Sequence, residues 1–180
     1  MDERGQLDRQ AVHAELERVP ADFHRLLAEA SAADLRRPTD GTGWTNEQML
    51  FHMLFGYMLI RVLLRLLGGF AKLPRSVGGT FARLLDAAAR PFHVINYVSS
   101  VLGSLYYNHR RMGAKMDRTV AALHRRLDRE STASLRRGMH YPPRWDPFFH
   151  DWMTRADLYR YPTQHYDFHR AQLTLGPAQD

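Results

Sequence analysis

The sequence predicts an all-α protein built as a four-helix bundle. Apolar residues recur at spacings of three and four in four long stretches, and clusters of Gly, Pro and Asp separate those stretches. No stretch shows the strict alternation of a convincing strand. With 180 residues and 44% hydrophobic content, the chain can bury one core, so we expect a single domain over residues 1–180.

The first helix is expected over residues 6–29, where Val12, Leu16, Val19 and Phe23 form an apolar stripe. Pro20 lies inside this pattern and either kinks the helix or splits it, because proline removes an amide donor and crowds the preceding turn. Residues 31–44 follow as a loop.

The second helix begins at Thr45, which forms a capping-box pattern with Gln48. Its apolar stripe includes a histidine, His52, at a position where the period calls for an apolar residue. A histidine there needs a partner. The pair Gly68 and Gly69 is expected to end the helix.

Residues from approximately 69 to 107 are predicted as an insertion between the second and third helices. It should hold a loop through Gly79, a short helix over residues 81–89 capped by Thr80, and an apolar run over residues 92–107. This segment could cover a site, extend a dimer interface or contact a membrane surface. We favour dimer or core packing.

Two apolar stretches, residues 49–67 and 92–107, raise the question of a membrane span. The first contains His52 and two arginines, and the second has only 16 residues, whereas a span needs about 20 clean apolar residues. We expect both to be buried helices without membrane contact. The amino terminus lacks the pattern of a signal peptide, so we expect a cytoplasmic protein.

The third helix is expected over residues 108–130, with Met112, Met116 and Val120 on its apolar stripe. The opposite face is rich in arginine, but Asp117 and Asp128 interrupt it and aromatic residues do not alternate with the basic ones. This pattern is typical of a solvated helix face, so we expect no nucleic-acid partner.

The fourth helix begins at a second capping-box pattern, from Thr154 to Asp157, and is expected to end at Gly176. A loop over residues 138–147 precedes it, and Asp146 at the end of that loop could cap a short helix of its own. Pro162 either kinks the last helix or restarts it.

The last helix carries His165 and His169, which are four residues apart, so both imidazoles lie on one face about one turn apart. Helical phase places His52 on the inward stripe of the second helix. Three imidazoles from two helices would leave a coordination position open, which is typical of a catalytic metal site. The alternative is that they are core histidines bonded to other polar groups.

The amino-acid composition limits which side chains could bind a metal ion. The chain contains no cysteine, so a metal can be held only through nitrogen or oxygen. Imidazole suits zinc, nickel, iron or copper, and ligand type does not choose among them. Three further residues near the histidine pair are weaker candidates for catalytic or supporting roles: Arg170, Gln172 and Tyr161. Each also has an ordinary reading as a packing or interface residue.

These motifs resemble those of the DinB superfamily of DinB/YfiT-like metalloenzymes. The resemblance rests on the run from Trp44 to His52 and on the later segment from His165 through His169 to Gln172, with their order and separation in an all-helical chain. It covers nearly the whole chain, with the insertion as the main departure. It implies an up-down-down-up bundle, often a homodimer, with His52, His165 and His169 as the metal triad.

The resemblance also implies chemistry. Members of this family bind a divalent ion, commonly nickel or zinc. The better understood ones resemble transferases or isomerases that use mycothiol, bacillithiol or glutathione, and related domains hold iron. Iron-dependent relatives follow the second histidine of the pair with x-Glu, whereas Arg170 and Ala171 stand here, so oxygenase chemistry is disfavoured.

Three hypotheses for the function follow. The first is a divalent-metal-dependent enzyme of thiol S-transferase type, with zinc or nickel favoured over iron, that acts on a small electrophile together with a low-molecular-weight thiol. The second is a metal-dependent hydrolase that uses a bound water. The third is a non-catalytic helical bundle that binds a partner or small molecule.

Overall fold

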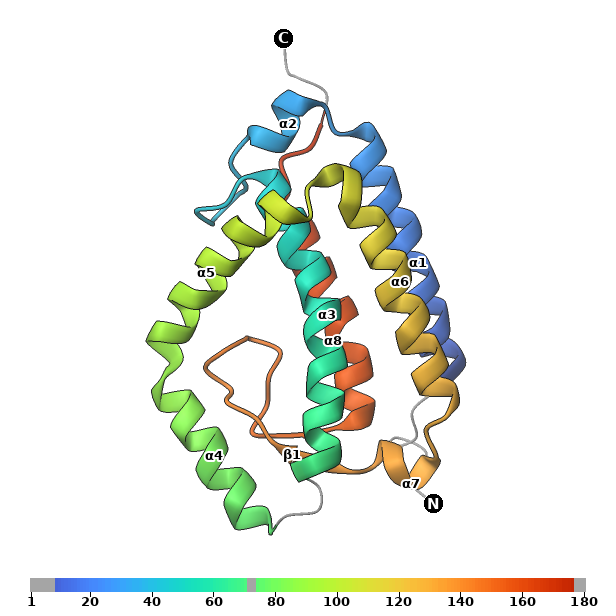
Figure 1. Cartoon of the computed structure of the whole chain (residues 1–180), viewed down its shortest axis with the longest axis vertical. Helices are drawn as coiled ribbons and strands as arrows, with labels where there is room; N and C mark the ends of the chain where they lie inside the picture. Colours follow the sequence, from blue (N-terminus) through green and yellow to red (C-terminus); the bar gives the residue numbers. More distant parts are fainter. Residues whose placement is uncertain (1–8, 71–73, 177–180) are drawn as a thin grey trace.

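The computed structural model describes residues 9–70 and 74–176, and four of its helices form the predicted bundle (Figure 1). They are α1 (Arg9–Glu29), α3 (Asn46–Phe70), α6 (His109–Asp128) and α8 (Arg155–Arg170). In the view of Figure 1, α1 runs upward, α3 and α6 run downward, and α8 runs upward. The all-α prediction and the up-down-down-up order are therefore confirmed.

The segment predicted as an insertion is the long crossover connection of the bundle. It consists of α4 (Arg75–Ala87) and α5 (Ala89–Tyr106), which together carry the chain from the lower end of α3 back to the upper end (Figure 1). α6 can then run parallel to α3, as bundles with crossover connections require. α5 packs against α3, and α4 packs against the strand β1 (Gly138–His140).

Several local predictions are wrong. The expected loop after α1 contains a short helix, α2 (Ala32–Arg36), which Ser31 and Asp34 stabilise through a reciprocal capping box. Periodicity cannot detect a helix of this length. α4 begins at Arg75, so Thr80 lies within the helix and does not cap it. The glycines that predicted a loop there lie in the helix, and Gly78 is buried.

The segment before α8 also differs from the prediction. It contains a second one-turn helix, α7 (Thr132–Leu135), and a two-stranded antiparallel sheet in which β1 pairs with β2 (Trp152–Thr154). Three-residue strands are too short to show alternation. Asp146 caps no helix. Its side chain and its carbonyl instead accept hydrogen bonds from Phe148 and Phe149, which closes a turn.

The ends of the long helices are partly as predicted. Both capping boxes are confirmed, since Thr45 N–H donates to Gln48 Oε1 at 3.0 Å and Thr154 N–H donates to Asp157 Oδ2 at 2.8 Å. Neither Pro20 nor Pro162 ends its helix. α3 continues through the glycine pair to Phe70, and α8 ends at Arg170, before Gly176.

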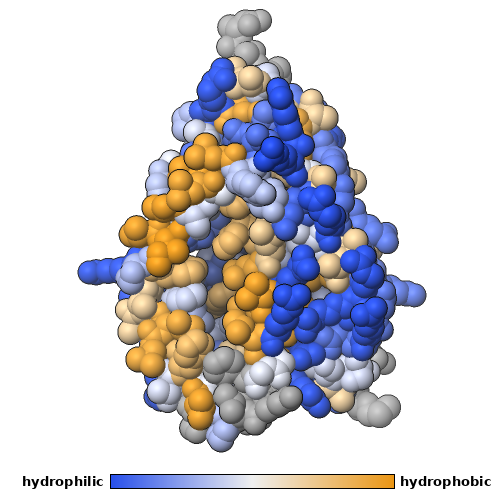
Figure 2. Space-filling model, in the orientation of Figure 1, coloured by the Kyte–Doolittle hydropathy of each residue, from blue (hydrophilic) through white to orange (hydrophobic). Residues whose placement is uncertain are grey.

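The core of the bundle is centred on α3, which packs against α8, α5 and α6. Its residues 46–69 are long and apolar enough to span a membrane, but 56% of the most apolar window is buried inside the structure. Core packing therefore accounts for its composition. The exposed apolar side chains gather along α4 and α5 (Figure 2).

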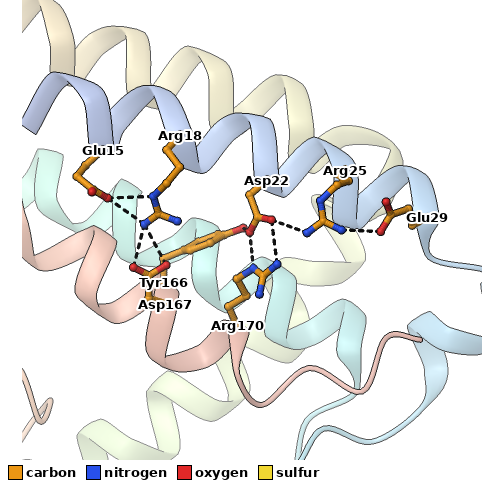
Figure 3. A network of polar contacts seen from close by, with 8 residues as sticks. All are labelled: Glu15, Arg18, Asp22, Arg25, Glu29, Tyr166, Asp167 and Arg170. Carbon is orange, nitrogen blue, oxygen red and sulfur yellow. Dashed lines mark hydrogen bonds and ion pairs between the residues drawn. The ribbon is translucent and has the colours of Figure 1, made fainter. Parts of the chain in front are cut away.

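A ladder of charged side chains joins α1 to α8 (Figure 3). Asp22 of α1 lies at its centre and accepts hydrogen bonds from Arg25, Arg170 and the hydroxyl of Tyr166. Arg18 extends the ladder to Asp167 at 2.9 Å. These contacts fix the rotation of α8, so its opposite face, which carries the histidines, is directed toward α3.

We expect Asp22→Asn to destabilise the fold. Burial alone would raise the pKa of Asp22, but hydrogen bonds from Arg170, Arg25 and Tyr166 outweigh it and lower the pKa to about 2. Loss of charged hydrogen bonds should reduce the free energy of unfolding at pH 7 by about 1–3 kcal/mol in denaturant titrations.

The pH dependence of that difference provides a second check. Because the pKa of Asp22 is lowered in the folded state, its contribution is complete above the ordinary value of about 3.9 and disappears as the pH falls toward 2. The difference in the free energy of unfolding between wild type and D22N should therefore disappear as the pH falls from about 3.9 toward 2. The exposed turn residue Asp40, changed to Asn, serves as the control, and an equal loss in both variants would contradict the role of the ladder.

Candidate metal centre

The three histidines predicted from the sequence come together between α3 and α8. His52 and His165 are buried, and His169 is partly buried. The ring centroids lie 4.8 Å apart for His52 and His165, 4.7 Å for His52 and His169, and 4.5 Å for His165 and His169. One nitrogen from each ring lies within 4.8 Å of the other two, so the three residues could hold one metal ion.

Gly56 of α3 makes this approach possible. A Cβ atom at this position would lie only 2.7 Å from His165 Nδ1, closer than side-chain carbons come to neighbouring atoms. Gly56 follows His52 by four residues, so both lie on the face of α3 that meets α8. The missing side chain creates the space that the His165 ring occupies.

Hydrogen bonds determine which nitrogen of His52 carries its proton. Ser100 of α5 donates its only hydroxyl proton to the carbonyl of Asn96 at 2.9 Å. At its 3.2 Å contact with His52 Nδ1, Ser100 Oγ must therefore accept a hydrogen bond. His52 is then protonated at Nδ1, and its Nε2 presents a lone pair. That Nε2 lies 3.2 Å from His165 Nε2.

The same reasoning applies to His169, whose Nδ1 lies 2.7 Å from Gln172 Oε1. An amide oxygen only accepts, so His169 Nδ1 donates and Nε2 is left with a lone pair. His165 differs, because its buried Nδ1 has no hydrogen-bond partner among the described residues. Metal-binding histidines commonly have their second nitrogen held by a neighbouring acceptor. His52 and His169 show this arrangement.

The surroundings keep all three imidazoles neutral. Burial, followed by the neighbouring His169, lowers the pKa of His52 to about 3. Burial and then the two other histidines lower the pKa of His165 well below its ordinary value. Burial also lowers the pKa of His169, partly offset by its bond to Gln172. Neutral imidazole is the form that binds a metal, so the donor set fits a divalent transition metal.

A carboxylate lies beside the histidines. Asp146 Oδ2 is 3.8 Å from His165 Nε2 and accepts a 2.7 Å hydrogen bond from the Tyr161 hydroxyl. Burial raises the pKa of Asp146. A cavity of about 20 Å³ lies among these groups, lined by His52, His165, Asp146 and Tyr161 together with apolar side chains of α3, α5 and the loop before β2. This volume is about that of one water molecule.

Aromatic rings and α5 cover the cluster. The Trp44 ring contacts the His52 ring with centroids 4.5 Å apart and a tilt of 32°, and Tyr97 of α5 stacks on Trp44 at 5.8 Å. Phe92 and Asn96 of α5 line the cavity. The crossover therefore packs on the core and also encloses the histidines.

The three weaker candidates have different positions. Tyr161 faces the cavity and binds Asp146. Gln172 lies in a turn after α8, not on the helix, and holds His169. Arg170 is directed toward α1, where it pairs with Asp22 (Figure 3).

Sequence reasoning missed three residues of the centre: Asp146 as a neighbour of His165, Ser100 and the special role of Gly56. Asn96, Ser100 and Ser104 recur every four residues in an otherwise apolar helix, which marks the buried face of α5. This recurrence of polar residues could have identified Ser100 as a buried residue from the sequence alone. Asp146 lies in an irregular loop, where no period predicts its neighbours.

The comparison with protein families identifies the family of the chain. The family model described as the DinB superfamily matches residues 15–173, a span that contains all three histidines. The chain belongs to the DinB superfamily. Comparisons with curated proteins and with solved structures give no match. The arrangement of this DinB protein, three neutral imidazoles on two helices of a bundle, is well suited to a divalent metal.

Gly56→Ala should disrupt the centre. The added methyl group meets the fully enclosed His165 ring, so either the ring or α8 must move. We expect the free energy of unfolding to fall by about 1–3 kcal/mol, as in other overpacked cores, and the affinity for zinc to fall with it. Chemical denaturation and competition with a chromophoric chelator would measure the two effects.

Gly69→Ala is the matched control, since a Cβ at that exposed position on the same helix meets no atom within 4 Å. Zinc binding by G69A should equal that of wild type. If G56A also retained wild-type affinity, the close approach of His165 to α3 would not be needed for binding.

Proposed function

We propose that this DinB protein is a divalent-metal-dependent enzyme of thiol S-transferase type, acting on a small electrophilic substrate. The supporting observation is the histidine cluster in a chain without cysteine. His52 and His169 present Nε2 lone pairs because Ser100 and Gln172 occupy their Nδ1 atoms. His52, His165 and His169 would hold the ion, with zinc or nickel favoured over iron.

A bound divalent ion would act as a Lewis acid that lowers the pKa of an incoming thiol and holds it as the thiolate. The chain itself contributes no thiol, so the thiol must come from a low-molecular-weight cosubstrate. Ser100 and Gln172 hold His52 and His169 in the tautomers that present Nε2 to an ion. The apolar walls from Phe55, Leu59 and Phe149 exclude bulk water, which strengthens electrostatic interactions at the site.

A second candidate function is hydrolysis, with water in place of the thiol as the entering group. The size of the cavity supports it, because about 20 Å³ accommodates one water molecule beside His52 and His165. The two functions differ in a measurable way: hydrolysis of an ester or amide needs no thiol, whereas S-transfer has an absolute requirement for one. The homodimer and the cytoplasmic location stay predictions.

Thiol titration of cobalt-loaded protein tests the first function. We expect a physiological thiol such as glutathione, bacillithiol or mycothiol to produce sulfur-to-cobalt charge-transfer absorption, because the thiolate would bind the metal directly. His52→Gln is the control and should abolish both stoichiometric cobalt binding and the thiol-dependent band. A cobalt spectrum that none of the thiols alters would refute S-transfer, and ester turnover without thiol would then favour hydrolysis.

A further inference from the structure

Asp146 is a mostly buried carboxylate without a cationic partner. Its side chain is 14% exposed, and within residues 9–70 and 74–176 it forms no ion pair with an arginine or lysine. Its two oxygens accept hydrogen bonds only from the Tyr161 hydroxyl at 2.7 Å and the Phe148 amide at 2.9 Å among the contacts described. A buried carboxylate in a neutral surrounding is costly unless a cation balances it.

The position of Asp146 suggests which cation would do so. Two ligand atoms that are each about 2.0–2.1 Å from a tetrahedral zinc ion lie about 3.3 Å apart. The two Nε2 atoms of His52 and His165 are 3.2 Å apart, close to that separation. Asp146 Oδ2 is 3.8 Å from the same His165 Nε2, about half an ångström longer than the separation of two ligand atoms on one zinc ion.

The crossover holds the loop that carries Asp146. The Arg144 amide donates to Asp86 of α4 at 2.9 Å, and Trp145 Nε1 donates to the Leu85 carbonyl at 2.7 Å. The Trp145 ring also stacks on Phe92 of α5, with centroids 3.8 Å apart and an interplanar angle of 12°. Three contacts to α4 and α5 therefore fix the two residues immediately before Asp146.

We propose that Asp146 is a fourth protein ligand of the metal, placed beside the histidines by the α4–α5 crossover. The proposal rests on the proposed metal centre and extends it from three imidazoles to three imidazoles and one carboxylate, so that an incoming thiolate would bind as a fifth ligand. Tyr161 is then a positioning residue, because its hydroxyl binds the oxygen that faces His165. The net charge of the occupied site falls from +2 to +1, which favours retention of a divalent cation in a buried setting.

The test measures metal binding alone, with zinc in competition assays and cobalt for absorption spectra. Asp146→Asn removes the charge and most of the ligand strength while keeping the size of the side chain. We expect at least a tenfold loss of zinc affinity and a changed intensity and position of the cobalt d–d bands. Asp151→Asn is the matched control: it lies in the same loop, is exposed, and pairs with His140. It should behave as wild type.

A third variant separates ligation from local structure. Tyr161→Phe deletes the hydrogen bond to Asp146 but keeps the carboxylate, so the cobalt spectrum should retain its wild-type band pattern with only a modest loss of affinity. Circular dichroism and thermal unfolding of each metal-free variant verify folding. We expect D146N to fold at least as stably as wild type without metal, since it removes an unbalanced buried charge.

The outcomes distinguish this proposal from the proposed function. Wild-type affinity and cobalt spectrum in folded D146N would overturn the role of Asp146 while leaving the histidine site intact. Asp146-dependent binding that no thiol perturbs would support the fourth ligand and refute S-transfer. A wild-type protein that binds neither zinc nor cobalt stoichiometrically would overturn both.

Discussion

The close packing of α3 against α8 at Gly56 is the constraint on which the centre depends. It brings the His165 ring against the backbone of α3, where a methyl group would already be too close. From there the ring faces His52, one turn earlier on α3. The opposite side of α8 is fixed to α1, where Asp22 pairs with Arg170 of α8 and with Arg25 of α1 itself (Figure 3). One helix is thus positioned from both sides, by an absent side chain and by a ladder of charges.

Burying imidazoles has consequences for their chemistry. Removed from water, they stay neutral, and each polar nitrogen then needs a partner or reduces stability. Ser100 and Gln172 provide partners for the outer nitrogens of His52 and His169, whereas the inner nitrogens of the cluster face one another. A cation would satisfy those inner lone pairs together. If the three residues were ordinary core histidines, the hydrogen bonds of their outer nitrogens would be explained, but the convergence of the three rings would not.

The sequence predicted those parts of the molecule that periodicity governs. Helical phase placed His52 on an inward stripe and His165 and His169 on one face, and the capping boxes at Thr45 and Thr154 located two helix starts. Phase could not predict Asp146, because its position depends on contacts between a loop and α4 and α5 that are distant in sequence. The short elements α2, α7, β1 and β2 also escaped, since each is shorter than the window in which a period is visible.

The crossover links the topology of the bundle to its centre. An up-down-down-up order requires the chain to return along the length of the bundle between α3 and α6, and this return must lie on the outside of the helices it connects (Figure 1). Here α5 lies along α3 at the level of His52, where it contributes Ser100, and Phe92 stacks against the loop before Asp146. A connection that the topology demands therefore also supplies a wall of the site. Changes in its sequence would alter the surroundings of the histidines without changing the bundle, because the four bundle helices pack on one another through other faces.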